Sequence, residues 1–241
     1  MKTIPVTGQG SKSFTIDHNN QPQRLILSNI YKDATIELSM ERQGESKIRT
    51  ISPVKVAFLI ELQNKIEFLQ GKRLQIFRYA TESSKEVIAS GIIDVGIGGE
   101  IVLQEKDYMF VDLKTLDNAS FNISISGGLR TAGTPFQLRK TKVDSGNSEL
   151  KVDLSQQRYI IFDKASMPDE IDFIRGDEKV VMSKELLLQE QENIFGVVAY
   201  DKTNVPVFGT NQAVVLQTAG LDGCYFRWSA DLAKDFYYWI V

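Results

Sequence analysis

The chain has 241 residues, of which 42% are hydrophobic and 24% are charged, and its formal net charge is −3. This composition is typical of a globular protein with enough apolar residues for two small cores, and the lack of a basic excess argues against direct binding of nucleic acid. With one histidine, His18, and one cysteine, Cys224, the chain cannot form an internal disulfide or a Cys/His zinc site.

The hydropathy of the chain gives no targeting signal. Residues 1–13 lack the apolar stretch of a signal peptide. The most apolar run, 54–62, is broken by Lys55 and Glu61, so no segment reaches the roughly 18–20 apolar residues of a membrane span. We therefore expect a folded protein that stays where it is made.

In the first half, alternation of apolar and polar residues predicts a series of short strands. Residues 1–12 are a polar lead-in, which we expect to be extended or mobile. The alternation then predicts strands at 13–17, 24–30, 35–41, 47–51, 73–79, 87–95, 100–103, 108–113 and 121–125. Ser52 followed by Pro53 is a typical helix start, so we expect a helix from there to about Gln70.

A Gly- and Thr-rich segment, 127–135, is the expected connection between two domains, 1–130 and 131–241. Beyond it the same alternation predicts strands at 136–143, 149–154, 158–162, 170–175, 179–182, 194–200, 213–217, 224–228 and 236–241. A short helix over 184–192 is expected after Ser183, which can accept hydrogen bonds from the free N–H groups of the first turn.

The two halves repeat one order of elements. Residues 23–48 and 157–180 align at an offset of about 134 residues, and each segment reads strand, strand, and a turn with Arg, Gly and Glu. A serine-opened segment rich in Leu and in Glu or Gln follows each turn. A repeat of this length is a whole small domain. Many short strands predict a sandwich or barrel, so we expect an all-β fold of two tandem eight-stranded jelly-roll β-barrels, each with a short inserted helix.

Few residues offer catalytic chemistry. His18 lies in a polar loop and Cys224 in a predicted strand, so we expect a solvated residue and a core residue respectively. The glycines within 96–99 lack the spacing of a phosphate-binding loop. The sequence leaves open a glycosidase-type pair drawn from Asp107, Asp144, Asp169, Glu170 and Asp172. We predict no catalytic, cofactor-binding or metal site.

Aromatic residues are concentrated near the end of the chain, at Tyr225, Phe226, Trp228, Phe236, Tyr237, Tyr238 and Trp239. Such a cluster is suited either to stacking against sugars or to filling a core or a subunit interface. The alternation of Phe226 with Trp228, and of Tyr237 with Trp239, favours core and interface.

The tandem arrangement resembles one family of proteins. The segments 159–173 and 186–188 with their first-half counterpart, and the pair 108–116 and 121–125, have the order and pattern of double jelly-roll major capsid proteins of icosahedral, membrane-containing bacteriophages. In size the chain is similar to the corticovirus type. The resemblance spans most of the chain and rests on order and pattern, without a signature motif.

This resemblance implies a structural protein and not an enzyme. It implies a homotrimer of pseudo-hexagonal outline, because two similar barrels in each of three subunits give six near-equivalent sides. Such trimers tile an icosahedral virion capsid around an internal lipid membrane and are made and assembled in the host cytoplasm. The implied partners are further copies of the chain, other capsid proteins such as the penton protein, and the membrane or its proteins, with no direct contact to nucleic acid.

Two other functions are compatible with the sequence. A carbohydrate-binding or adhesin-like β-sandwich, as in a phage spike or tail, predicts exposed aromatic residues in a groove and a monomeric protein. An enzyme on a β-sandwich, such as a glycoside hydrolase, requires two carboxylates that converge in a cleft.

Overall fold

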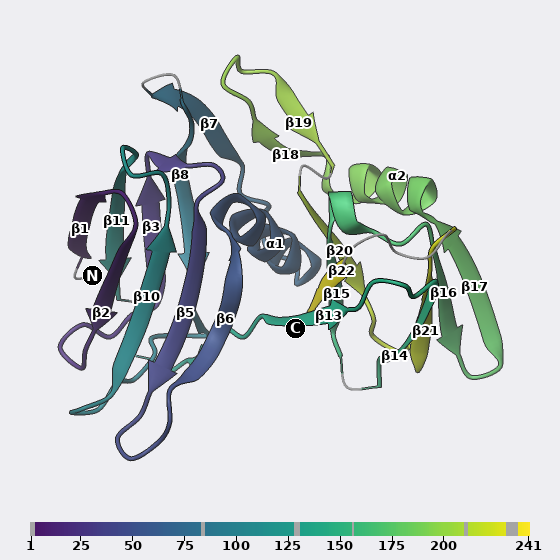
Figure 1. Ribbon diagram of the computed structural model, residues 1–241, viewed down its shortest axis with the longest axis horizontal. Coiled ribbons are helices and arrows are strands. Elements are labelled where there is room, and N and C mark those ends of the chain that lie inside the picture. The colour runs from purple at the N-terminus through teal and green to yellow at the C-terminus, as the bar shows by residue number, and fades with distance from the viewer. Residues whose placement is uncertain (1–2, 83–84, 128–130, 156, 210–211, 230–235) are drawn as a thin grey trace. The chain divides into compact units, whose positions relative to one another are not determined.

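Figure 1 shows the computed structural model, which describes residues 3–82, 85–127, 131–155, 157–209, 212–229 and 236–241. Within these ranges the fold is built mainly from strands, with the helices α1 (Val56–Leu69) and α2 (Lys184–Phe195) and the short 3-10 helix η1 (Lys164–Ser166). In this part of the chain, no helix has the length and apolar character needed to cross a membrane.

Two antiparallel sheets form the layers of the first half (Figure 1). One sheet begins, in order of pairing, with β1 (Thr3–Gln9), β11 (Ser120–Ser126), β3 (Arg24–Ser28) and β8 (Lys85–Asp94). The other contains β2 (Lys12–Ile16), β10 (Tyr108–Lys114), β5 (Thr35–Glu41) and β6 (Ile48–Lys55). Every second residue of the inner strands is buried, which is the pattern that two packed sheets require, as in Leu25, Leu27, Ile36, Leu38, Met109 and Val111.

The second half repeats this arrangement. One sheet contains β13 (Arg139–Val143), β22 (Phe236–Ile240), β15 (Tyr159–Asp163) and β20 (Ala213–Gln217). The other contains β14 (Glu149–Asp153), β21 (Gly223–Arg227), β16 (Glu170–Arg175) and β17 (Glu178–Ser183).

The strand order is the same in both halves. If the eight strands of each half are counted along the chain, one sheet has the order 1-8-3-6 and the other has the order 2-7-4-5. This is the order of an eight-stranded jelly roll. In each half the helix lies between the fifth and sixth strands, α1 after β6 and α2 after β17. The predicted fold class is therefore confirmed, and the two helices occupy equivalent places in the two rolls.

Further strands extend the first roll. Beside β8 lie β4 (Ile30–Tyr31) and β7 (Phe77–Glu82), and β7 pairs in parallel with β18 (Val197–Tyr200). The sheet ends with β19 (Pro206–Phe208). A separate two-stranded ribbon joins β9 (Gly96–Ile97) to β12 (Thr134–Pro135).

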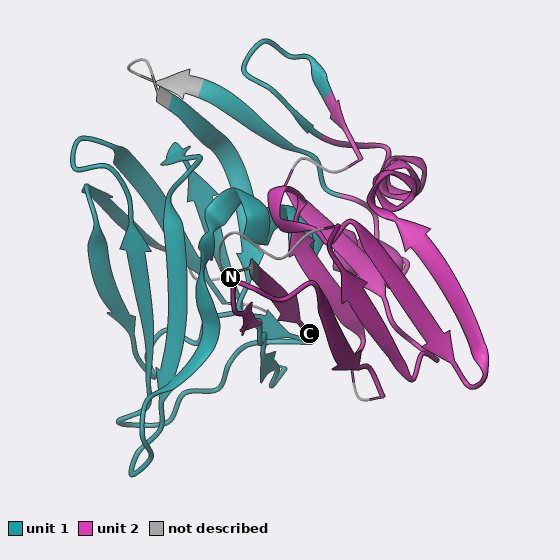
Figure 2. Ribbon diagram, turned by 45° about the vertical axis from the view of Figure 1, so that its right-hand side comes forward, with its two compact units in different colours: residues 1–64, 75–138, 199–206 teal, residues 65–74, 139–198, 207–241 magenta. Residues whose placement is uncertain are grey.

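Packing divides the chain into two units, which Figure 2 shows in different colours. The first consists of residues 1–64, 75–138 and 199–206, and the second of residues 65–74, 139–198 and 207–241. The division therefore assigns short segments of each half to the unit of the other half. The domain boundary between 130 and 131 stays a prediction, and residues 128–130 lie outside the described part of the chain.

Three aromatic rings pack together in the core of the second roll. The ring of Phe226 meets those of Phe162 and Tyr238 edge to face, with centroids 5.1 and 5.3 Å apart. Such contacts add about 0.5–1.5 kcal/mol per pair to the burial of apolar area. Cys224 is fully buried in the same core, so the predictions of core positions for Cys224 and Phe226 are confirmed.

Residues 1–12, for which we predict extended or mobile backbone, are extended over most of the part that the structure describes. Residues Thr3–Gln9 form β1, an edge strand paired with β11 along its whole length. Pro5 is compatible with this position, because an edge strand accepts proline. Gly8 lies opposite Phe121, and a Cβ atom at Gly8 would lie 2.7 Å from the Phe121 ring.

The predicted helix start at Ser52 and Pro53 is wrong. Both residues belong to β6, and the helix begins at Val56. The pairing of β5 with β6 shifts register next to these residues, and a proline is tolerated at such a bulge on an edge strand. The predicted strand at 100–103 is absent, since Glu100 forms an isolated bridge and the following residues are irregular.

The helix start at Ser183 is confirmed. Ser183 has extended backbone angles, and its Oγ accepts a hydrogen bond from the backbone N–H of Leu186 at 3.3 Å. The helix is longer than predicted and ends at Phe195, so the following strand begins at Val197.

Candidate functional site

His18 and Cys224 are not placed for catalysis. His18 is exposed in a turn, where its backbone carbonyl accepts a hydrogen bond from the Gln21 side chain at 2.8 Å. Burial raises the pKa of the Cys224 thiol to about 12. A thiol with this pKa is protonated at physiological pH and is a poor nucleophile.

Two of the five predicted carboxylates, Glu170 and Asp172, share a line of ion pairs across the second roll with Glu149. Arg227 reaches Glu149 at 2.9 Å, Glu170 at 3.5 Å and Asp172 at 2.8 Å. Lys179 binds Asp172 from the other side at 2.6 Å. Asp172 is fully buried, and its two cations compensate the charge, as a buried carboxylate requires. The line joins all four strands of one sheet, so its first role is to hold this sheet together.

The first roll repeats part of this arrangement. Glu37 of β5 binds Arg49 of β6 at 2.5 Å, as Asp172 of β16 binds Lys179 of β17. In both rolls the cation lies opposite the residue two positions after the carboxylate. The two pairs therefore occupy equivalent places, which supports a common origin of the halves.

The remaining predicted carboxylates lie apart from this line and stabilise loops. Asp169 accepts hydrogen bonds from the N–H and hydroxyl of Ser229, which lower its pKa. Asp107 accepts from two loop N–H groups, which also lower its pKa. Asp144 is exposed and pairs with Lys142 at 2.7 Å. A glycosidase needs one carboxylic acid whose pKa is raised, whereas the pKa values of Asp107 and Asp169 are lowered.

The aromatic cluster lies largely inside the fold. Phe226 and Tyr238 belong to the core, and Trp239 is also buried. Trp228 packs edge to face on Phe226 with ring centroids 6.4 Å apart. Tyr237 is half-buried beneath the Lys140 ammonium, which lies 3.8 Å from its ring centre. With these contacts the aromatic side chains pack within the fold and do not form an exposed surface on which a sugar could stack.

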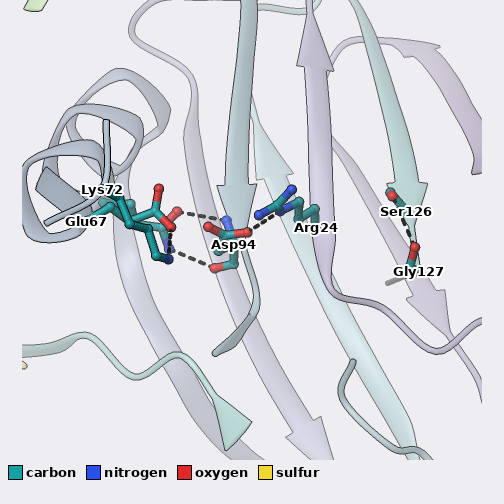
Figure 3. A network of polar contacts seen from close by, with 7 residues as sticks. Arg24, Glu67, Lys72, Asp94, Ser126 and Gly127 are labelled. Carbon is teal, nitrogen blue, oxygen red and sulfur yellow. Dashed lines mark hydrogen bonds and ion pairs between the residues drawn. The ribbon is translucent and has the colours of Figure 1, made fainter. Parts of the chain in front are cut away.

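A glutamine anchors each helix to its roll. The Gln63 side chain of α1 donates to the backbone carbonyl of Asp94 at 2.7 Å and accepts from its N–H at 2.8 Å. The Gln191 side chain of α2 makes the same two bonds to Val215, at 2.9 and 3.1 Å. An amide side chain thus pairs with the strand edge as another strand would. Arg24 binds the Asp94 carboxylate at 2.7 Å and fixes the first anchor further (Figure 3).

The second roll carries an open apolar groove of about 350 Å³. It lies between α2 and strands β16, β17 and β20, and the end of α1 contributes Leu69. Its main apolar lining residues are Phe173, Val180, Met182, Leu187, Ile194 and Phe195. This groove could not be predicted from the sequence, because its lining residues come from segments that are distant along the chain. The available signal was the adjacent apolar pair Val180 and Val181, which directly follows the charged residues Glu178 and Lys179 in a short strand.

No family model and no curated protein matches the sequence. Over its whole length the chain is similar to the crystal structure of the STIV MCP, a viral major capsid protein with a double jelly roll. The TM-score is 0.50 and the identity 12%, and the match covers 100% of this chain and 96% of that one. The fold is a double jelly roll.

A second solved structure, the PBSX exported protein XepA, matches with a TM-score of 0.26 and 9% identity, over 98% of this chain and 84% of that one. A score this low does not support an argument about the fold. The double jelly roll therefore rests on the strand order and on the first likeness.

Proposed function

We propose that this protein is a structural subunit of a viral capsid. The proposal is supported above all by the presence, in one chain, of two jelly rolls with the same strand order, together with the likeness of the whole chain to the STIV MCP. A subunit of this kind acts by self-association and has no catalytic site.

The proposed assembly is a homotrimer. Three chains with two similar rolls each present six near-equivalent sides, and a pseudo-hexagonal block of this shape can tile an icosahedral shell by closed, symmetric contacts. In the corticovirus-like arrangement the shell encloses a lipid membrane. The other partners of the subunit are a penton protein and the membrane or its proteins. The subunit is assembled in the host cytoplasm, and its final location is the virion capsid.

The polar chemistry is in keeping with a structural role. The predicted carboxylates are held by cations or by N–H and hydroxyl groups, and for Asp107 and Asp169 the hydrogen bonds lower the pKa and favour the charged form. In the described part of the chain, no group of three or more His, Cys, Asp or Glu residues is placed to hold a metal ion. The net charge of −3 also fits a subunit that does not itself bind the genome.

The mass of the purified protein in solution tests this proposal. We expect light scattering at micromolar concentration to give about three times the 27.2 kDa mass of the chain, and electron microscopy to show pseudo-hexagonal particles or sheets. A protein that stays monomeric at high concentration and hydrolyses a glycan, with loss of activity when a carboxylate pair is replaced, would overturn it. A monomer that binds glycans without hydrolysis would point instead to the adhesin-like function.

A further inference from the structure

The two helix anchors align α1 and α2 residue by residue. Gln63 is the eighth residue of α1 and Gln191 is the eighth residue of α2, and each binds the N–H and carbonyl of one residue in the sixth strand of its roll. Since both helices meet their strands through the same position, other positions correspond too. Leu59 and Leu187, at the fourth position, are both fully buried.

The same alignment reveals positions at which the burial of the two helices differs. Phe58 and Ile66 of α1 are 1% and 5% exposed. Their counterparts in α2, Leu186 and Ile194, are also large and apolar, but they are 45% and 46% exposed. The second roll therefore keeps apolar side chains at positions that one copy of the chain leaves uncovered.

The two strands that precede the helices, β6 and β17, also differ in how far their outer edges are covered. In the first roll, Leu138 bonds to the outer edge of β6, accepting from the N–H of Ser52 at 3.2 Å and donating to the carbonyl of Thr50 at 2.9 Å. In the second roll, β17 lies at the end of its sheet and pairs with β16 alone among the described strands. Val180 in this strand is 57% exposed. An open edge with apolar side chains favours association with another chain.

These features form one surface, which we call the α2–β17 face and define by Val180, Met182, Leu186, Glu190 and Ile194. The groove described above runs through it, since Val180, Met182, Glu190 and Ile194 line that groove. Contiguous exposed apolar surface of this kind is typical of sites that bind another protein.

We propose that a second copy of this chain covers the α2–β17 face and that this contact is the subunit interface of the trimer. The inference rests on the capsid function proposed above and names the surface through which it operates. A second copy is the occupant that fits, because the equivalent positions in the first roll are already buried by this same chain. In a closed homotrimer each copy can cover the α2–β17 face of the next, so that no such face is left exposed.

Charged substitutions on this face test the proposal. Leu186→Asp and Ile194→Asp each place a carboxylate where the partner would pack, whereas Gln189→Asp adds the same charge at an exposed position of α2 outside the α2–β17 face and is the matched control. We expect the wild type and Gln189→Asp to be trimers by light scattering. Each of the other two variants should associate roughly 30-fold or more weakly, the effect of removing a strong interface contact. Circular dichroism should show all of them folded, since both replaced side chains are half-exposed in one chain.

A thiol probe gives a second measurement that does not depend on disrupting the trimer. Cys224 is buried, so Leu186→Cys introduces the one accessible thiol, and Gln189→Cys is its control. In the trimer we expect Leu186→Cys to resist a thiol reagent that labels Gln189→Cys promptly.

Prompt labelling of Leu186→Cys in an intact trimer, or full trimer formation by both aspartate variants, would overturn this inference while leaving the trimer itself standing. A wild-type protein that is monomeric at high concentration would instead overturn the proposed function, and the inference with it.

Discussion

Asp107 ties together two loops of the first roll. Its carboxylate accepts hydrogen bonds from the backbone N–H groups of Gln43 and Gln104, both at 3.0 Å, and Arg42 lies 3.9 Å away. The bonds from Gln104 and Gln43, with the Arg42 charge as a smaller contribution, lower the pKa of Asp107 below its ordinary value of 3.8. Stability from this site is therefore present above pH 3.8 and is lost as the pH falls through the lower pKa of the folded state.

We expect Asp107→Asn to destabilise the protein by about 1–3 kcal/mol at pH 7. Whichever way the new amide turns, its NH2 group faces one of the two backbone N–H groups and leaves it without an acceptor. Urea denaturation measures the effect, and the difference from the wild type should narrow as the pH falls from 3.8 through the lower pKa of Asp107 in the folded state. Asp144→Asn, at an exposed position, is the control and should change stability by less than about 0.5 kcal/mol. Equal stability of Asp107→Asn and the wild type at pH 7 would contradict this account.

Cys224 offers a direct test of the second core. Because its side chain is fully buried and its thiol pKa is raised to about 12, the folded protein should not react with a disulfide reagent at pH 8 during the time in which urea-unfolded protein is labelled completely. Reaction then reports opening of the core and should accelerate with denaturant. Rapid labelling of the native protein would show that the core around Phe226 is open.

At the scale of the element, each glutamine anchor satisfies the backbone N–H and carbonyl of a strand residue, as a neighbouring strand would. β20 is the last strand of its sheet, and Gln191 supplies both a donor and an acceptor to its open side. We expect Gln191→Ala to leave the N–H and carbonyl of Val215 without partners, at a cost of roughly 1–3 kcal/mol for each group. Gln63→Ala should cost less, because the bonds to Asp94 are only partly buried.

Urea denaturation of these variants compares the two anchors directly. Gln189→Ala removes an exposed glutamine from the same helix as Gln191 and controls for the effect of alanine on helix propensity. If Gln191→Ala is no less stable than Gln189→Ala, then the α2 anchor does not hold the strand edge.

Local pattern predicted several strands, either from alternation, as in TIELSME, or from a short apolar run, as in AVVLQ. The predicted bounds of Thr35–Glu41, Glu170–Arg175 and Ala213–Gln217 coincide with β5, β16 and β20, because each strand has a buried face that its own sequence displays. Ser52 and Pro53 misled the prediction, since the same two residues open a helix or end an edge strand at a bulge. Only the pairing of β5 with β6 decides between these outcomes, and that pairing is a long-range property.

The α2–β17 face could not be predicted from the sequence either, because burial on α2 depends on contacts with residues that are distant along the chain. Gln191 lies in a run of Glu and Gln that is typical of a solvated helix face, yet it is 2% exposed because β20 lies beneath it. Leu186, Leu187 and Leu188 are equally apolar, and only the helix orientation makes Leu187 a core residue and Leu186 a surface one. The sequence shows that α2 is amphipathic but not which residues at the edge of its apolar face remain uncovered.

At the scale of the whole molecule, the two units are not separable by one cut. Residues 65–74 of the first half belong with the second unit, where the Lys65 ammonium donates to the backbone carbonyl of Ala213 at 2.6 Å. Residues 199–206 of the second half belong with the first unit, where Ala199 pairs with Phe77 and Asn204 accepts from Arg78 at 3.1 Å. Each unit thus depends on a segment that the other half of the chain supplies.

We therefore expect fragments 1–138 and 139–241, produced separately, to be less stable than the full chain or unfolded. Each fragment loses buried contacts that it cannot replace, such as the Lys65 bond to a strand edge, and each exposes apolar surface at the cut. The full chain should unfold in one transition, with fluorescence and circular dichroism changing together. Mixing the two fragments should restore part of the lost structure, because the missing segments are then present again. If fragment 139–241 melts at the same temperature as the full chain, the rolls fold independently and the exchanged segments contribute nothing to stability.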